Sequence, residues 1–509
     1  MGSERLSSRS AEKKEGHVRD VLLRGGRVID PGTGTDQVAD VLVRDGSVHE
    51  IGVGLRVPSG ATVLDVSGHV VGPGFIDLHS HVNSITGQRL QAMDGVSTAL
   101  ELEAGATPVD LAYRVTAREG RPLNYGFSAS WAAARAQVLL GSEPGSSVEA
   151  TFGILGDPGW QRDSSPAELT AWLDVLAGEL ADGALGIGVL LGYAPRTDPA
   201  EFLAVARIAA KAGAPTFTHA REIVEADPTT PIDGAEELVR AAGETGAAMH
   251  HCHVNSTSRR HVDRVLALLA SARAAGSPVT VEAYPYGAGS TTISAFFLAP
   301  ERLSAWGIRP QSIVLVATGE RIADDARLRE VRATDPAATC IVEFLDENDP
   351  NDRALLARAL SFPDSIVASD AMPVFLPKGA PDPLAWPLPP GSATHPRTSG
   401  TFARAIRLLV RETGTWSWAE AFRRCAWLPS RVVAGIAPDA ADKGHLGVGA
   451  DADIVVIDPN RFTDNATFTA PTRVSTGVTH LLVNGEFVVR DGELHTEAFP
   501  GRPLRGRPA

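Results

Sequence analysis

The chain is short of positive charge, and lysine in particular is rare. It carries 47 lysines and arginines against 61 aspartates and glutamates, which gives a formal net charge of -14. Proteins that bind nucleic acid or anionic membranes need clustered cations to neutralise phosphate groups. We therefore expect no nucleic-acid partner and no membrane partner, whereas a small neutral or polar substrate is compatible with this charge.

Cysteines and long apolar runs are also scarce. The three cysteines are an odd number at wide spacing, which predicts no disulfide framework and favours a reducing compartment. No long uncharged apolar run occurs, and the polar segment 1–17 lacks the apolar stretch typical of a signal peptide. These absences predict a cytoplasmic protein in which residues 1–17 form a disordered tail.

Length and turn-forming residues are plentiful. The 509 residues, with 50 glycines and 35 prolines, exceed what one ordinary core needs. Short alternating apolar runs, broken by Gly and Asp-Gly turns, occupy residues 18–72 and return at residues 439–509, where Asn484-Gly485 marks a hairpin. We expect these two distant segments to build one small β-sandwich domain.

Residues 73–438 have a different texture, in which short apolar runs alternate with helical stretches rich in Ala, Leu and Arg. Several runs end in ionisable residues, as the strands of a parallel barrel do where its chemistry gathers. This pattern predicts an α/β fold with a catalytic (β/α)8 TIM-like barrel. Residues 287–351 are too many for one βα connection and predict an inserted subdomain.

The strongest local signal is a pair of histidines two residues apart. In GFIDLHSHV, an apolar run ends in His79 and His81, so both imidazoles leave the same face of an extended strand. A lone His-x-His is more often a pair of surface histidines than a metal site. The preceding apolar strand favours chelation of one metal ion.

Three further strand-like runs end in residues that can bind metal. His219 ends PTFTHA, Asp370 ends SIVASD, and alternation in MHHCHVN places His251 and His253 on one face. One such residue alone would be a core histidine or a helix cap, but the repeated set on successive strands indicates a metal centre. These ligand types suit several ions, so iron or nickel remains open beside zinc.

Five segments occur in an order that points to a known family: GFIDLHSH, THAR, YPYGAGSTT, VASD and HPRTSGTFARAI. They resemble the amidohydrolase superfamily, most closely the N-acyl-D-amino-acid deacylase (D-aminoacylase) branch, over nearly the whole chain beyond residue 18. The resemblance implies a split β-sandwich, one or two Zn²⁺ ions, and Asp370 as proton shuttle. The implied histidine ligands are His79, His81, His219 and His253.

Within HHCH, the choice of His253 comes from alignment with that branch, and His251 is kept in reserve. His250 and Cys252 lie on the opposite face, so we expect them to be packing residues.

A bridge between two metal ions needs a further ligand. In many superfamily members it is a carboxylated lysine, but no lysine occupies a strand end here, and D-aminoacylases use a cysteine where this chain has Ala104. Glu101 and Glu103 lie beside that position, and a carboxylate can supply an oxygen ligand for zinc. We favour Glu103 because it is nearer the strand end, with Glu101 as the alternative.

The resemblance also implies substrate contacts. Arg397 matches the arginine that clamps the substrate carboxylate, a task suited to its bidentate fork. Tyr284 and Ser290 match further contacts, and Tyr193 is expected beside them. Asn255 stands where the branch has a lysine, and we expect it to contact substrate.

The implied reaction is hydrolysis of a linear amide, most simply deacylation of an N-acyl (D-)amino acid. The metal would lower the pKa of water to about 7, and Asp370 would move its proton to the leaving nitrogen. Ser130-Trp131 replaces the Gly-His pair of the branch, so a cyclic amide or an acylated secondary metabolite stays open as substrate. A catalytically silent scaffold is the alternative of another class. The sequence does not indicate the oligomeric state.

Overall fold

The computed structural model describes residues 20–143, 145–380 and 382–507, and the expected disordered tail at 1–17 lies outside them. Within this described part, eight parallel strands form a nearly closed barrel whose strand order follows the chain. The N–H of His81 donates to the carbonyl of Ala371 at 2.9 Å, which brings the first and last strand ends together. The barrel strands are β6 (Phe75–Asp77), β7 (Val96–Ala106), β8 (Asn124–Ser130), β9 (Ile187–Leu190), β10 (Thr216–His219), β11 (Met249–His251), β12 (Val279–Ala283) and β16 (Ser365–Val367).

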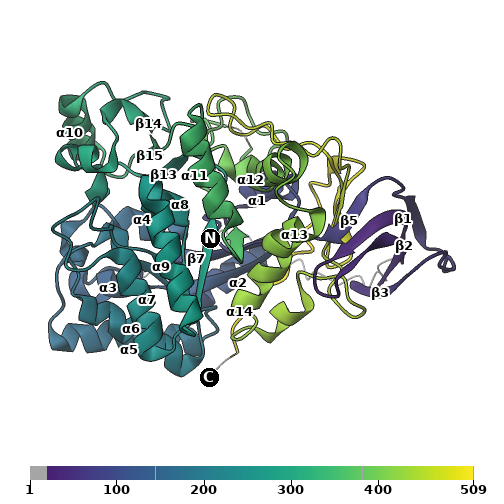
Figure 1. The fold of residues 1–509 in the computed structure, drawn as a ribbon, viewed down its shortest axis with the longest axis horizontal. Coiled ribbons are helices and arrows are strands. Elements are labelled where there is room, and N and C mark those ends of the chain that lie inside the picture. Colours follow the sequence, from purple (N-terminus) through teal and green to yellow (C-terminus); the bar gives the residue numbers. More distant parts are fainter. Residues whose placement is uncertain (1–19, 144, 381, 508–509) are drawn as a thin grey trace, which may run out of the picture.

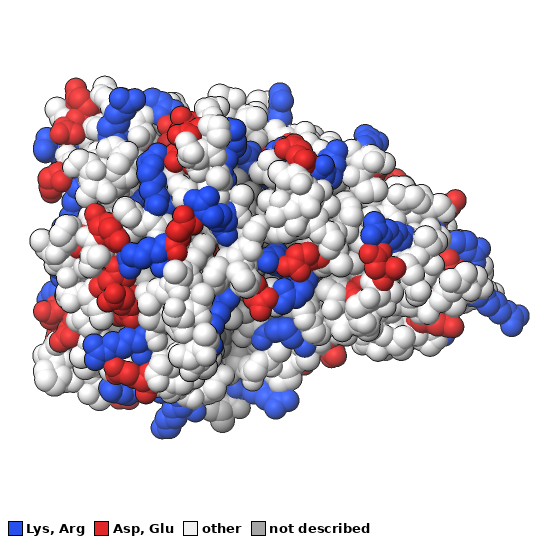
Figure 2. All heavy atoms as spheres, viewed as in Figure 1, with Lys and Arg blue, Asp and Glu red and all other residues white. Residues whose placement is uncertain are grey.

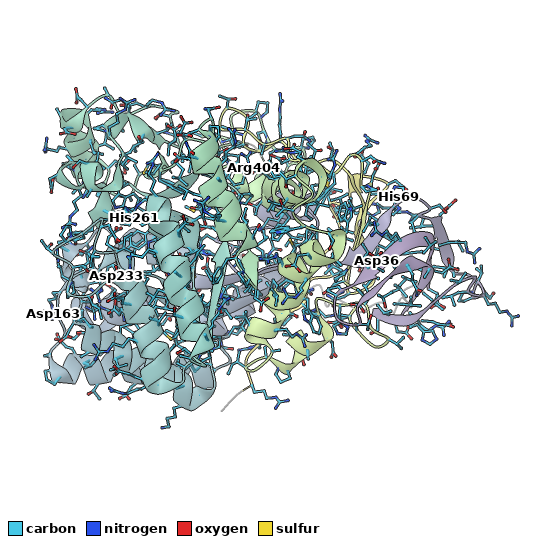
Figure 3. All side chains as sticks on the ribbon, viewed as in Figure 1. Asp36, His69, Asp163, Asp233, His261 and Arg404 are labelled. Carbon is cyan, nitrogen blue, oxygen red and sulfur yellow. The ribbon has the colours of Figure 1, made fainter. Side chains whose placement is uncertain are left out.

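Helices surround the barrel, as its strands require. Every residue of β7 is buried, because a parallel strand is covered on both faces. Helix boundaries follow the local sequence: Asp233, labelled in Figure 3, accepts hydrogen bonds from the N–H groups of Ala235 and Glu236 and so caps α7. The helices are α1 (Ile85–Ala92), α2 (Val109–Glu119), α3 (Trp131–Leu140), α4 (Val148–Ile154), α5 (Pro166–Ala181), α6 (Pro199–Ala212), α7 (Gly234–Thr245), α8 (Val254–Ser258), α9 (Val262–Ala274), α10 (Asp325–Thr334), α11 (Pro350–Ser361), α12 (Arg397–Ile406), α13 (Trp418–Phe422) and α14 (Leu428–Val433).

A second sheet is built from both ends of the chain and has its own apolar core. Its parts meet where β5 pairs antiparallel with β17, and strands β1 to β3 lie at the end of the molecule away from α10 (Figure 1). The predicted fold class, a TIM-like barrel with a small β-domain built from both chain ends, is confirmed, and among the described residues the strands of that β-domain form one 9-stranded sheet. The strands are β1 (Val21–Asp30), β2 (Thr35–Arg44), β3 (Ser47–Gly52), β4 (Thr62–Asp65), β5 (Val70–Pro73), β17 (Ile454–Ile457), β18 (Val478–Val483), β19 (Glu486–Arg490) and β20 (Glu493–Leu494).

A third, antiparallel sheet lies between β12 and β16. It consists of β13 (Ala288–Thr292), β14 (Ile313–Leu315) and β15 (Thr339–Glu343), with α10 beside it at the upper left of Figure 1. We propose that residues 287–351 form an inserted subdomain around this sheet. We likewise propose 73–438 as the barrel domain, and 18–72 with 439–509 as the sheet domain.

The surface carries charges of both signs. On the face shown in Figure 2, basic and acidic side chains are interspersed over both the barrel and the sheet domain. Among the described residues, no helix is long and apolar enough to cross a membrane.

Candidate metal centre

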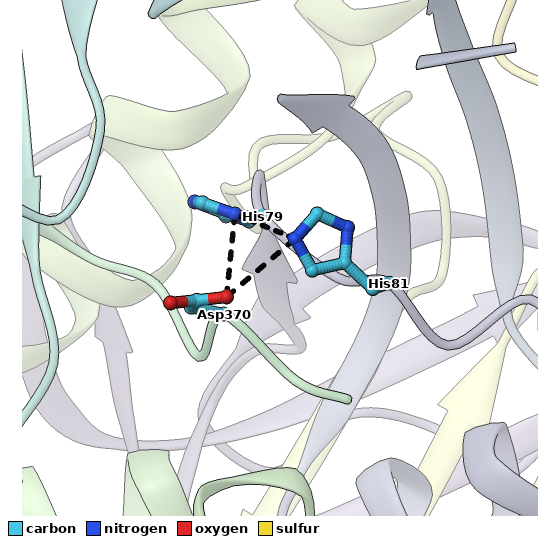
Figure 4. A group of neighbouring side chains, drawn as sticks. All are labelled: His79, His81 and Asp370. Carbon is cyan, nitrogen blue, oxygen red and sulfur yellow. Dashed lines mark hydrogen bonds and ion pairs between the residues drawn. The ribbon is translucent and has the colours of Figure 1, made fainter. Parts of the chain in front are cut away.

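Two histidines follow β6 and meet at the carboxyl end of the barrel. The Nε2 atoms of His79 and His81 lie 3.1 Å apart, and each is 3.5 Å from Oδ1 of Asp370 (Figure 4). Both rings are almost completely buried. Asp370 comes from the loop after β16, so the first and last barrel strands together place three possible ligand atoms around one point.

Glu103, near the end of β7, lies between this group and two further histidines. Its Oε2 is 3.2 Å from Nε2 of His79, and its Oε1 is 2.7 Å from Nε2 of His253 and 3.1 Å from Nδ1 of His219. Burial raises the pKa of Glu103, but the three histidines outweigh burial and hold that pKa well below its usual range. A carboxylate in this position has the arrangement that a bridge between two ions requires.

The donor set fits a divalent ion such as zinc. The Nδ1 atoms of His79 and His81 contact the carboxylates of Glu282 and Glu101, at 2.5 and 2.9 Å. With one proton held at each Nδ1, a metal ion that displaces the other proton meets the Nε2 lone pairs of both rings, which lie beside one carboxylate oxygen of Asp370. Buried imidazoles and carboxylates converging in this way are typical zinc ligands.

The two glutamates of β7 have different positions. Glu101 contacts Nδ1 of His81, and its Oε1 accepts the N–H groups of Ala104 and Gly105 at 3.2 and 3.3 Å. Burial lowers the pKa of His81, yet Glu101 outweighs burial and raises that pKa to about 9. Glu101 therefore fixes the ring of His81 from behind, whereas Glu103 contacts His79, His219 and His253.

The HHCH run divides in a way that strand alternation did not predict. Strand β11 ends at His251, whose Nδ1 lies 3.0 Å from the carbonyl of Cys252, outside the cluster. His253 has a left-handed backbone (φ 32°) that directs it to Glu103. His250 is fully buried and packs against Phe217, as expected of a packing residue, and its Nε2 also contacts Glu282 Oε2 at 2.9 Å.

Sequence reasoning missed Glu282 on β12. Its Oε1 contacts Nδ1 of His79 and accepts the N–H of His253 at 3.3 Å, and its Oε2 contacts His250. The available signal was one acidic residue inside the apolar run VTVEAYPY. A charge in such a run is costly unless it has partners.

A cavity of about 220 Å³ opens onto the cluster, and Tyr193, Tyr284 and Ser290 line it, as do His81, Glu103, His219, His253 and Asp370. Arg397 lies behind this wall with no exposed surface. Its Nη2 is 2.8 Å from Oδ1 of Asp370, and its Cζ lies 4.8 Å from the ring centroid of Tyr284.

Two other positions lie away from the cavity. Asn255 is not among the residues that line the cavity, and its amide bonds the backbone of Tyr284 (3.3 Å) and Tyr286 (3.4 Å), so its predicted contact with substrate stays a prediction. Trp131 is buried and packs edge-on against Trp160.

Comparison with known proteins identifies the family. A family model described as the amidohydrolase family matches residues 265–489. The chain is 30% identical over 471 residues to an N-acyl-D-glutamate deacylase of Alcaligenes xylosoxydans xylosoxydans, covering 86% of this chain and 85% of the relative. A D-aminoacylase of the same organism is 28% identical over 461 residues, covering 84% and 85%.

Solved structures give the same result. The crystal structure of the N-acyl-D-glutamate deacylase from Bordetella bronchiseptica, complexed with zinc and a phosphonate inhibitor, has a TM-score of 0.75 and 26% identity, covering 96% of this chain and 100% of that chain. A D-aminoacylase with a binuclear metal centre shares the fold, with a TM-score of 0.73 and 22% identity over 96% and 99% of the two chains.

The barrel and the convergent ligands define a metal-dependent hydrolase that acts on carbon-nitrogen bonds other than peptide bonds. The chain belongs to the amidohydrolase family. The resemblance to the D-aminoacylase branch, the enzyme class and the dependence on metal, all predicted from sequence, are thereby confirmed.

Proposed function

We propose that this enzyme deacylates small N-acyl amino acids of the D configuration, with one or two zinc ions held by His79, His81, Glu103, His219 and His253. The observation that carries the proposal is the carboxylate of Glu103, which lies between two sets of histidine nitrogens at the cavity. The relatives named as deacylases of N-acyl-D-amino acids support the substrate class.

Asp370 is the proposed proton carrier. A bound zinc ion supplies two effects, a lowered pKa of water and a polarised amide carbonyl. Asp370 lines the cavity and faces the same histidine nitrogens. It accepts the proton of the attacking water and passes it to the leaving nitrogen, because an amine departs poorly as an anion. Arg397, 2.8 Å from Oδ1, holds the carboxylate in place.

Arg397 is also the proposed anchor for the substrate carboxylate. Beyond its contact with Asp370, the guanidinium nitrogens have no hydrogen-bond partner among the described residues, although they are fully buried. Unpaired buried donors are costly, so they favour an anionic ligand. A Cβ on Gly289 would lie 3.1 Å from the Tyr284 hydroxyl and 3.6 Å from Arg397 Nη1, so glycine keeps this space open.

The experiment combines metal analysis with an amidase assay on one preparation purified without chelator. We expect one or two equivalents of zinc and hydrolysis of N-acetyl-D-amino acids at least tenfold faster than of their L forms. Protein that neither retains nor rebinds zinc contradicts the metal assignment. Hydrolysis of the L series alone contradicts the configuration, and hydrolysis of cyclic amides alone contradicts the deacylase assignment.

A further inference from the structure

One wall of the cavity is a continuous stack that begins at a metal-facing histidine. The ring of His219 is parallel to that of Phe297 (12°, centroids 6.1 Å apart), and Phe297 is stacked on Trp306 (11°, 4.7 Å). The guanidinium carbon of Arg259 lies 3.7 Å from the ring centroid of Trp306. All four residues line the cavity, so this aromatic wall extends from the metal cluster to Arg259.

The charge of Arg259 is already compensated. Its Nη2 lies 2.9 Å from Oε2 of Glu222, and the side chains are only 4% and 7% exposed. Among the described residues that line the cavity, Arg259 is the only arginine or lysine. Away from the metal cluster, the cavity lining thus has two carboxylates, those of Glu149 and Glu222, and one cation, Arg259. Because Arg259 is already paired, a second carboxylate on the substrate would find no free positive partner there.

The remaining surface beyond the cluster is largely apolar. It is formed by side chains from α4 and β15, from the residues that follow them directly, and from the loop after β16. These apolar lining residues are Phe152, Leu155, Val342, Phe344, Met372, Pro373 and Phe375. Such a surface stabilises an apolar group by removing it from water.

We propose, building on the deacylase function above, that the substrate carries an apolar amino-acid side chain, and that the Glu222–Arg259 pair rejects acidic ones. Because Glu222 pairs with Arg259, this arginine is not free to bind an anion, and the two charges neutralise each other. This chain then differs in substrate from its relatives named as deacylases of N-acyl-D-glutamate and N-acyl-D-aspartate. A buried polar group left without its partner discriminates strongly between substrates.

The experiment compares kcat/KM for N-acetyl-D-leucine and N-acetyl-D-glutamate on the zinc-loaded enzyme. We expect leucine to be preferred by at least about 30-fold, since an unpaired buried carboxylate is costly. Glu222→Gln removes the negative charge that pairs with Arg259, which leaves the arginine free to bind an acidic side chain. The ratio of kcat/KM for N-acetyl-D-leucine to that for N-acetyl-D-glutamate therefore falls about tenfold. In Arg259→Met, the unpaired Glu222 repels the acidic side chain and the ratio rises.

Glu225→Gln is the matched control, because Glu225 pairs with Arg264 and does not line the cavity. In this variant the leucine-to-glutamate ratio of kcat/KM should equal that of the wild type. An acyl series from N-acetyl to N-octanoyl-D-leucine separates side-chain from acyl-chain recognition, and a preference that depends on the acyl group alone overturns the proposal. So does a wild-type preference for glutamate, or an equal ratio in all variants. A lack of hydrolysis of every N-acyl amino acid instead contradicts the deacylase function itself.

Discussion

At the scale of single residues, the ring nitrogens of His79, His81 and His253 that face the cluster are selected by the contacts of the other nitrogen in each ring. Glu282 and Glu101 contact the Nδ1 atoms of His79 and His81, which leaves Nε2 for the ion. Ser256 contacts Nδ1 of His253 at 3.1 Å in the same way. The carboxylates behind the ligands therefore determine which atoms face the metal.

This arrangement makes Glu282 a positioning residue with a measurable effect. In Glu282→Gln the side chain keeps its length but loses the charge that holds the Nδ1 proton of His79. We expect zinc affinity to fall by about 10- to 100-fold, the usual effect of removing such a partner. Competition with a chromophoric chelator measures it, and kcat should fall less than the affinity once zinc is saturating.

The control for Glu282 is Glu343→Gln, which removes an exposed glutamate paired with Arg321. Its zinc affinity should match that of the wild type. Equal affinities in both variants would mean that Glu282 does not position His79.

The sequence predicted candidate ligands where strands end, but it did not predict contacts between side chains on distant strands. His79, His81 and Asp370 could be chosen because each follows an apolar run. Glu282 lies 203 residues beyond His79, so their contact depends on strand placement that no local pattern encodes. The contacts of Asn255 could not be predicted for the same reason, since its backbone partners belong to the loop after β12.

At the scale of elements, an irregularity in β7 separates the two glutamates. The pairing of β7 with β8 shifts register between Glu101 and Ala106. Gly105 has φ 67°, and a Cβ there would lie 2.7 Å from Oγ of Ser128. Only glycine tolerates both the conformation and the contact. Sequence alternation kept both glutamates as candidates because a bulge of this kind cannot be read from periodicity.

A helix also depends on a neighbouring helix for its cap. Pro108 offers no side-chain cap for α2, and Glu179 of α5 instead accepts the N–H of Val109. Burial raises the pKa of Glu179 to about 7. The folded protein therefore binds this proton more tightly than the unfolded chain, in which a glutamate has a pKa of about 4.3. Stability from this group is present at low pH and is lost as pH rises through about 4.3 to 7.

Glu179→Gln tests this pH dependence. Glutamine still accepts the N–H of Val109 but does not titrate, so we expect the melting temperature to fall less between pH 5 and 7.5 than in the wild type. Calorimetry at both pH values measures the difference. Asp174→Asn, an exposed change on the same helix, should keep the wild-type slope. If the melting temperature of Glu179→Gln falls between pH 5 and 7.5 as much as that of the wild type, Glu179 does not cause this pH dependence.

At the scale of the whole molecule, a buried polar cluster joins the C-terminal part of the chain to the barrel. Asp453 accepts hydrogen bonds from Nζ of Lys443 (2.8 Å), from the amide of Asn124 on β8 (2.8 Å) and from the N–H of Asn484 (2.7 Å). The sequence predicted that the two ends share a domain. It did not predict the connection of the C-terminal segment to β8, because these polar residues carry no periodic signal.

Lys443→Met tests the contribution of this cluster to stability. The substitution leaves the carboxylate of Asp453 buried without its cation, and breaking one partner of a buried ion pair costs about 3–5 kcal/mol. We expect the free energy of unfolding in urea to fall by this amount. Adding Asp453→Asn to Lys443→Met should restore part of the loss, because the amide removes the unpaired charge. Lys211→Met, exposed on α6, is the matched control and should change stability by less than about 0.5 kcal/mol. Equal stability of Lys443→Met and the control would show that the ion pair of Lys443 with Asp453 does not stabilise the fold.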